Sequence, residues 1–235
     1  MARILLIETS ASTLSVAVAQ DGVVLTERIC REPRRQASLT APLVKETLDA
    51  ASLRLPDCDA VAVSSGPGSY TGLRVGVSTA KGLCFGASLP LIAVGTPDIL
   101  VAGARCAVSA GHDGDSNRPS FIVPMIDARR MEVYTAVYNS EGERITPVEA
   151  KIVEAGAYDE YLCAGKVLFV GDGAMKCREV LSHPNAMFMA SEPLASNMAS
   201  LAEAAFRASR FEDVAYFEPF YLKDFVATVS RKNLL

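Results

Sequence analysis

The order of apolar and polar positions along the chain predicts alternating strands and helices. A continuous apolar run near the N-terminus is typical of a strand buried on both faces, and two β-rich runs separated by Asp21–Gly22 predict a hairpin after it. Apolar residues then recur at helical spacing, with Ser38 and either Ser69 or Thr71 as the expected helix caps. The elements expected in this half are strands over 4–7, 14–19, 23–29, 59–65 and 89–94, and helices over 38–53, about 70–86 and from Thr96 onward.

The same order begins again about 119 residues later. Ile7–Glu8 corresponds to Ile126–Asp127 at this offset, and the pattern predicts strands over 121–126, 131–138, 144–151 and 167–170. A glycine-rich turn follows the later buried strand in each half, at 66–68 and at 171–173. The repeat predicts a duplicated β-β-β-α-β-α unit, which is the ribonuclease H-like lobe of the actin, Hsp70 and sugar-kinase superfamily. A chance recurrence of ordinary α/β patterning is the alternative.

The duplication predicts an α/β protein of two lobes. We expect the N-terminal, partner-binding lobe to comprise 1–102 together with 196–216, because the amphipathic helix over 196–209 returns to the first lobe. The C-terminal lobe should cover 119–195. The polar, turn-rich stretch 103–118 is expected to be a linker or surface insertion, and 217–235 a C-terminal tail whose aromatic first part packs on the body.

Composition excludes several classes of protein. With 235 residues, 50% of them hydrophobic, the chain is neither disordered nor a coiled coil. A net charge of −4 argues against binding nucleic acid by phosphate neutralisation. The six cysteines contain no C-x-x-C pair and suit a reducing compartment, and no apolar run is long enough for a membrane span or a signal segment. We therefore expect a cytoplasmic protein that does not associate with a membrane.

An acidic residue ends the first strand of each half. In the superfamily that the topology resembles, a carboxylate from each lobe and the neighbouring turns surround a nucleotide phosphate and its metal. The loop at 66–69 matches neither the P-loop nor the dinucleotide-binding motif, so taken alone it favours a tight strand-to-helix turn. The candidate nucleotide- or phosphate-facing residues are Glu8, Thr9, Ser10, Gly66, Gly68, Ser69, Asp127, Gly171 and Gly173.

The sequence contains few residues in the patterns that catalysis or metal binding requires. The chain has two histidines, His112 and His183, far apart in sequence and without the spacing of a metal-binding pair. Neither is placed to act as the base of a Ser or Cys nucleophile. We expect no catalytic residue and no metal site.

The helix over 70–86 contains two pairs of glycines, each four residues apart. Glycine is unfavourable inside a helix, so close approach of another element is expected there, either within the domain or from a partner subunit's helix. The candidate partner-interface residues are Leu39, Leu43, Gly72, Leu73, Gly76, Val77, Ala80 and Leu83.

Several segments, in order over nearly the whole chain, resemble the TsaB (YeaZ) family. They are Ile-Glu-Thr-Ser at 7–10, Ser-Val-Ala-Val at 15–18, Gly-Pro-Gly-Ser-Tyr-Thr-Gly-Leu-Arg at 66–74, Asp-Ala-Arg-Arg at 127–130 with Glu132-Val133-Tyr134, and Glu218-Pro219-x-Tyr221-Leu222. The chain departs from the family at Glu8, where the family has Asp, and at Gln36-Ala37-Ser38, where it has His-Ser-Glu.

The resemblance implies a non-catalytic scaffold subunit. Its partners would be TsaD, which transfers a threonylcarbamoyl group to N6 of adenosine 37 in tRNAs reading codons that begin with A, and the ATPase TsaE. It also implies a homodimer in isolation, contact with tRNA through the complex, and helices 38–53 and 70–86 forming a four-helix bundle with TsaD or with a second copy. No cofactor is expected to be tightly bound, and ATP or ADP is expected only at the interface of the complex.

An enzyme of the same fold is the alternative. It would be a small-molecule kinase or a nucleotide hydrolase that uses Glu8 and Asp127. A protease is the third reading, and the missing base and metal ligands argue against it. Nucleotide turnover by the isolated protein would favour the enzyme, whereas nucleotide binding only with a TsaD-like partner would favour the scaffold.

Overall fold

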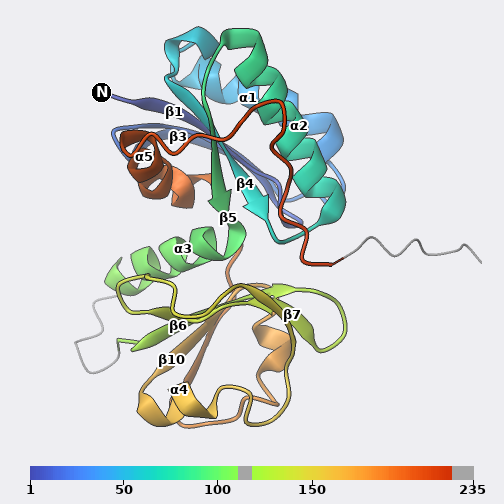
Figure 1. Cartoon of the computed structure of the whole chain (residues 1–235), viewed down its shortest axis with the longest axis vertical. Coiled ribbons are helices and arrows are strands. Elements are labelled where there is room, and N and C mark those ends of the chain that lie inside the picture. Colours follow the sequence, from blue (N-terminus) through green and yellow to red (C-terminus); the bar gives the residue numbers. More distant parts are fainter. Residues whose placement is uncertain (111–117, 224–235) are drawn as a thin grey trace, which may run out of the picture.

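Two β-sheets, one above the other in Figure 1, form two lobes in this computed structural model, which describes residues 1–110 and 118–223. The first sheet has the strand order β3-β2-β1-β4-β5. Neighbours β1, β2 and β3 are antiparallel, whereas β4 and β5 continue the sheet in parallel. Its strands are β1 (Arg3–Glu8), β2 (Leu14–Gln20), β3 (Val23–Cys30), β4 (Ala60–Gly66) and β5 (Leu91–Gly95).

The second sheet repeats this topology. Its order is β11-β10-β6-β7-β9, with an antiparallel meander on one side of β6 and parallel strands on the other. β6 therefore takes the place of β1, β7 and β9 those of β2 and β3, and β10 and β11 those of β4 and β5. The strands are β6 (Phe121–Asp127), β7 (Glu132–Thr135), β8 (Tyr138–Asn139), which pairs with β6, β9 (Glu149–Ile152), β10 (Val167–Val170) and β11 (Ala186–Met189). The predicted duplication of a ribonuclease H-like α/β unit is confirmed.

The second meander is more broken than its sequence predicts. The strands expected over 131–138 and 144–151 shorten to β7, β8 and β9. The loop between β8 and β9 folds back, and its Ile145 N–H donates to the Val137 carbonyl while the Thr146 hydroxyl accepts from the Val137 N–H at 2.9 Å. These bonds satisfy the backbone of Val137 without a ladder, so regular pairing stops there.

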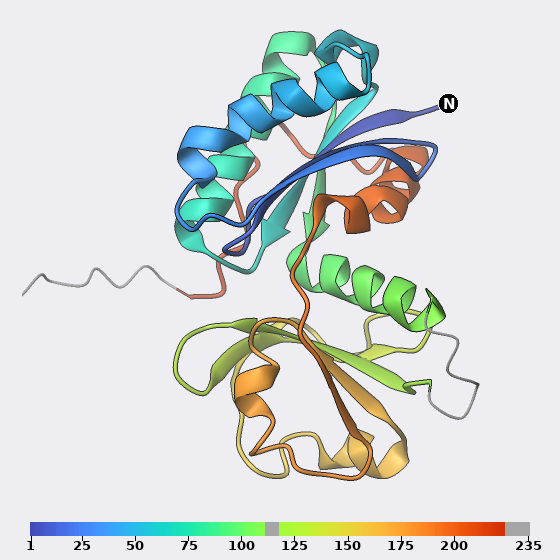
Figure 2. The ribbon, with the colours of Figure 1, turned by 180° about the vertical axis from the view of Figure 1, so that it is seen from behind.

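Helices cover both faces of the first sheet. α1 (Gln36–Ala50) and α2 (Tyr70–Ala87) lie on one face, and α5 (Ala199–Arg207), entered through a 3-10 turn over Ala195–Met198, lies on the other. Figure 2 shows from behind how the chain leaves the second lobe as a single connection to reach α5. Besides α3 (Thr96–Ala110), which joins the lobes, the described residues also form α4 (Asp159–Ala164) in the second lobe and 3-10 turns over Leu55–Asp57 and Met175–Cys177.

Of the helix caps predicted from the sequence, the one at Ser69 is confirmed and the one at Ser38 is wrong. The Ser69 hydroxyl accepts a hydrogen bond from the Gly72 N–H at 3.3 Å, so Ser69 caps α2 as expected. α1 begins at Gln36, two residues earlier than predicted, with Arg35 in the cap position, so the cap predicted at Ser38 is wrong. The Ser38 hydroxyl instead donates back to the Arg35 carbonyl within the first turn.

The predicted boundary at 103–118 is wrong over its first half. α3 (Thr96–Ala110) continues through it without a break. The helix lies between the two sheets in Figure 1, and its Val101 and Ala104 pack with Ile122 and Leu168 of the second lobe. Burial of this apolar face stabilises the helix beyond the point where the sequence turns polar. Of the rest of the predicted linker, residues 111–117 lie outside the described residues.

The C-terminal segment runs along α2. The Lys81 ammonium donates to the Ala215 and Phe217 carbonyls at 3.1 and 2.9 Å, and the Phe220 N–H donates to the Ser65 carbonyl at 2.8 Å. The Tyr221 and Tyr70 rings lie with their centroids 5.0 Å apart. The aromatic first part of the predicted tail therefore packs on the first lobe, whereas its basic end lies within 224–235, outside the described residues.

Candidate functional site

The end of β1 is closed to solvent. Glu8, Thr9 and Ser10 are all fully buried, and the Glu8 Oε1 atom accepts from the Ser10 N–H at 2.5 Å. Burial raises the pKa of Glu8 to about 7. Hydrogen bonds from Ser10, Ser64 and Thr9 lower the pKa, but their effect is smaller than that of burial. A carboxyl in this setting is a structural group at the base of the sheet rather than an open ligand.

Glycines of the loop and of α2 allow this closure. A Cβ atom on Gly72 would lie 2.1 Å from the Thr9 carbonyl oxygen, and one on Gly68 would lie 2.3 Å from the Ser10 carbonyl oxygen. The Ser69 N–H donates to that same Ser10 oxygen at 2.7 Å. The loop at 66–69 is thus a tight turn packed on β1, and at least one N–H that could have faced a phosphate is already bonded.

The equivalent place in the second lobe holds an ion pair. The Lys176 ammonium pairs with the Asp127 carboxylate and also donates to the Glu132 carbonyl at 2.7 Å. Partial burial raises the pKa of Asp127, but the hydrogen bonds from Lys176 and from the Arg129 N–H outweigh it, so the pKa lies below its usual value. The Asp127 N–H donates to Asp172 at 2.9 Å.

The second glycine turn packs as the first one does. A Cβ atom on Gly171 would lie 2.4 Å from the Met125 carbonyl oxygen, and one on Gly173 would lie 2.9 Å from it. The turn after β10 therefore lies against β6, as the turn after β4 lies against β1. Duplication extends from the strand order to these two close backbone contacts.

The residues present do not fit a metal-bound phosphate between the two strand ends. Glu8 is enclosed, and the Lys176 ammonium occupies the side of Asp127 where a cation would bind. Within the described ranges, no group of three or more His, Cys, Asp or Glu side chains could hold a metal ion. Lys176 was missed from the sequence, where its one signal is its position three residues after the second glycine turn.

Most of the predicted partner-interface residues face inward, so their assignment to a surface is wrong. The core between the sheet and the two helices contains Leu43, Val77 and Ala80, and Leu39 and Leu83 pack on its edge. Leu73 is also buried, with its side chain next to Gly66. Gly72 and Gly76 lie against Thr9. Helical periodicity identified the apolar face of α2, but that face covers the sheet.

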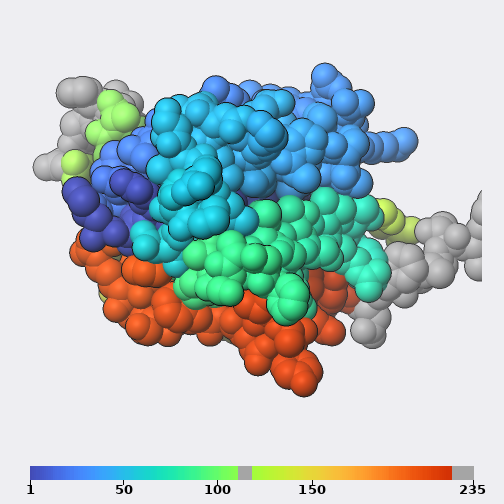
Figure 3. All heavy atoms as spheres, turned by 90° about the horizontal axis from the view of Figure 1, so that it is seen from above, coloured from blue at the N-terminus to red at the C-terminus, as the bar shows by residue number. Residues whose placement is uncertain are grey.

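The outer face of α1 and α2 has a different composition. We define it by its exposed residues Ala41, Lys45, Arg74, Ser78, Gly82, Phe85 and Gly86. Phe85 is 85% exposed, and a Cβ atom on Gly82 or Gly86 would meet no heavy atom within 4 Å. Figure 3 shows the two helices side by side at this end of the molecule, α1 in blue and α2 in green. Phe85 was missed because the sequence pattern does not tell an outward aromatic from an inward one.

No described helix is both long and apolar enough to cross a membrane.

Comparison with known proteins places the chain among tRNA-modification proteins. A family model described as TsaD, tRNA N6-adenosine threonylcarbamoyltransferase, matches residues 33–230. The chain is 30% identical over 233 residues to the tRNA threonylcarbamoyladenosine biosynthesis protein TsaB of Escherichia coli, a match that covers 96% of each protein. It is also 33% identical over 147 residues to TsaB of Bacillus subtilis, covering 61% of this chain and 59% of that protein.

Solved structures agree with the sequence matches. YeaZ from Pseudomonas aeruginosa superposes with a TM-score of 0.79 at 28% identity, covering 94% of this chain and 100% of that one. The resemblance noted from the motifs at 7–10, 66–74 and 127–130 is thereby confirmed. With a relative that matches along almost its whole length and a structure of the same fold, the chain belongs to the TsaB (YeaZ) family of tRNA threonylcarbamoyladenosine biosynthesis proteins.

Proposed function

We propose that this chain is a non-catalytic scaffold subunit for transfer of a threonylcarbamoyl group to tRNA, acting with a TsaD-like subunit and a TsaE-like ATPase. The observation that carries the proposal is the closure of both strand ends. Glu8 is buried under the glycine turn, and Asp127 is neutralised by Lys176 within its own lobe. Similarity to TsaB of Escherichia coli, a tRNA threonylcarbamoyladenosine biosynthesis protein, supports a role in that biosynthesis.

The same closure argues against the kinase or hydrolase alternative. An enzyme of that kind would need an open carboxylate and a bound metal beside the transferred phosphate. Opening the Asp127 site would require breaking the Lys176 ion pair, and opening the Glu8 site would require moving α2 away from Thr9. A nucleotide is therefore expected only where a partner completes the site.

The partner surface in this proposal is the outer face of α1 and α2. An aromatic side chain that is 85% exposed has a large area to bury, and Gly82 and Gly86 on either side of it let a second helix approach closely. A TsaD-like subunit and a second copy of this chain would use the same face, so heterodimer and homodimer exclude each other. Contact with tRNA would come through the complex, in the cytoplasm.

Reconstitution tests the proposal. The purified chain, the TsaD-like and TsaE-like subunits, and all three together are incubated with substrates and unmodified tRNA, and the modified nucleoside is measured by mass spectrometry. We expect product only from the mixture. Product, or nucleotide turnover, from this chain alone would overturn the scaffold role.

A further inference from the structure

A cavity between the lobes lies apart from the outer face of α1 and α2. Its volume is about 420 Å³, within the roughly 300–1,000 Å³ typical of small-molecule sites. Four parts of the first lobe line it: β5, α3, α5 and the segment after α5. The turn between β8 and β9 adds Gly142 and Arg144 from the second lobe. A ligand here would touch both lobes.

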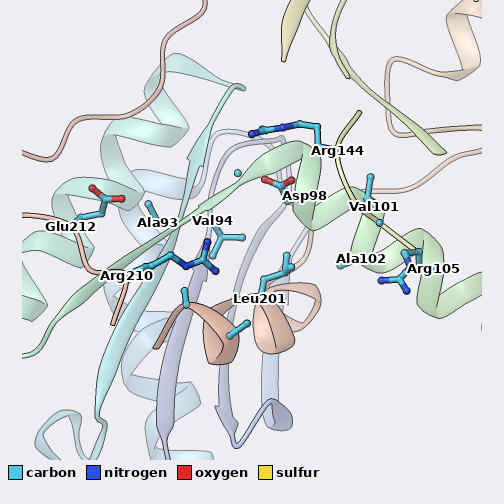
Figure 4. A pocket seen from close by; sticks show the side chains of 14 residues that line it. Ala93, Val94, Asp98, Val101, Ala102, Arg105, Arg144, Leu201, Arg210 and Glu212 are labelled. Carbon is cyan, nitrogen blue, oxygen red and sulfur yellow. The ribbon is translucent and has the colours of Figure 1, made fainter. Parts of the chain in front are cut away.

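The lining combines an apolar floor with a positively charged rim. The floor consists of small and aliphatic side chains that include Val94, Leu201 and Ala204. Arg105, Arg144 and Arg210 outnumber the carboxylates Asp98 and Glu212, so the net charge of the lining is positive. Figure 4 shows Asp98 between Arg144 and Arg210, with Arg105 farther along α3.

Hydrogen bonds and ion pairs show which charged side chains of the lining already have a charged or structural partner. The Arg105 Nε–H donates to the Ser140 carbonyl at 3.1 Å, and the Asp98 carboxylate accepts from the Tyr138 hydroxyl at 2.8 Å, so both side chains help to join α3 to the second lobe. Within residues 1–110 and 118–223, neither Arg144 nor Arg210 has a carboxylate at ion-pair distance. The Arg144 side chain is hydrogen-bonded to the Tyr138 hydroxyl, which is uncharged and therefore does not neutralise the guanidinium group. Each lobe thus contributes one guanidinium group without a carboxylate partner to the edge of the apolar hollow.

We propose that this cavity binds a small organic anion whose phosphate or carboxylate group is held by Arg144 and Arg210 and whose apolar body lies on Val94, Leu201 and Ala204. Guanidinium groups bind both oxyanions through paired, charge-assisted hydrogen bonds. Because the site draws one arginine from each lobe, binding would also hold the lobes together. The proposal does not depend on the proposed function, since no residue of α1 or α2 lines the cavity.

Phenyl phosphate and benzoate are suitable probes, because they share an apolar ring and differ in the anion. Benzyl alcohol is the uncharged control. Binding to the full chain is measured by calorimetry and by the rise in Tm with probe concentration, up to about 10 mM, which still detects weak sites. The probe that binds more tightly identifies the anion class.

Three variants and one control test the location. Arg144→Gln and Arg210→Gln should each weaken binding about tenfold by removing charge-assisted hydrogen bonds. Ala204→Leu should weaken it comparably by filling the floor, and since Ala204 is exposed on α5, a leucine there is compatible with the helix. Arg28→Gln, on an exposed arginine of β3, is the matched control and should bind as the wild type does.

The outcomes separate clearly when circular dichroism shows that each variant is folded. Saturable binding of either anion that is lost in the three variants and kept in Arg28→Gln supports the proposal. The proposal is overturned if neither anion binds saturably, if Arg144→Gln and Arg210→Gln bind as the wild type does, or if benzyl alcohol binds as tightly as the anions.

Discussion

Two glycines of α2 should respond in opposite ways to the same substitution. In Gly72→Ala the new methyl group would lie 2.1 Å from the Thr9 carbonyl oxygen, whereas such contacts do not occur below 3.0 Å. α2 and β1 would therefore have to separate by roughly 1 Å. In Gly82→Ala the methyl group meets no heavy atom within 4 Å.

The expected magnitudes follow from these contacts. Overpacking of a well-packed contact lowers the free energy of unfolding by about 1–3 kcal/mol. Replacement of glycine by alanine in an open helical position raises it by about 0.5–1 kcal/mol. The two variants should thus differ by about 1.5–4 kcal/mol, which for a chain of this size corresponds to roughly 3–16 °C in Tm, with Gly82→Ala above the wild type and Gly72→Ala below it.

Urea unfolding followed by circular dichroism, together with thermal melting, measures both variants at low protein concentration, so that self-association through the outer face does not contribute. The slope of the free energy against urea should stay unchanged, because neither substitution alters the surface exposed on unfolding. If Gly72→Ala were as stable as Gly82→Ala, the close packing of α2 against the end of β1 would be refuted.

Three further predictions concern charge and association. Glu8→Gln should remove a pH dependence of stability, because the pKa of Glu8 is raised to about 7 in the folded chain. The stability that the protonated Glu8 contributes is fully present below its unfolded pKa and is lost as pH rises through about 7. In urea titrations the free energy of unfolding of Glu8→Gln should therefore exceed that of the wild type by up to about 3 kcal/mol at pH 8 and match it near pH 4. Lys176→Met should lower stability by about 1 kcal/mol or less at pH 7, an effect that fades as pH falls through the lowered pKa of Asp127; a loss that persists in acid would show that packing rather than charge is responsible. Phe85→Ser should weaken association with the TsaD-like subunit about tenfold in gel filtration or calorimetry without lowering Tm, while Val23→Ser, also an exposed apolar residue, should leave it unchanged; equal binding by both would place the interface elsewhere.

The strand order was accessible from the sequence because it depends on local patterns. The Asp21–Gly22 turn between two β-rich runs predicts the first hairpin, and both residues have the positive φ angles, 50° and 77°, that a tight hairpin turn requires. The recurrence of Ile7–Glu8 as Ile126–Asp127 then predicts a second unit with the same topology. The repeat strengthened the predicted strand order, because the same pattern of strands and turns occurs in both halves.

The sequence does not show which positions of α2 face the sheet and which face solvent. Gly72 and Gly76 lie against Thr9, which is more than sixty residues earlier, whereas Gly82 and Gly86 are open. All four have the same spacing and the same intrinsic preference, so only the position of β1 distinguishes them. Lys176 was missed for the same reason, because its position just after the second glycine turn does not by itself indicate a contact with Asp127, which is 49 residues earlier.

The course of the chain through the lobes has a consequence for synthesis. The second sheet lies entirely between Phe121 and Met189, so all its strands emerge together. The first sheet emerges earlier, but Ile4 and Leu6 on one of its faces are covered by Met198 and Ala202, which are translated only after the whole second lobe. During translation that face stays without its helix while the whole second lobe is made, and a nascent chain with an uncovered apolar sheet is prone to associate. The lobe that leaves the ribosome first is therefore the last to be completed.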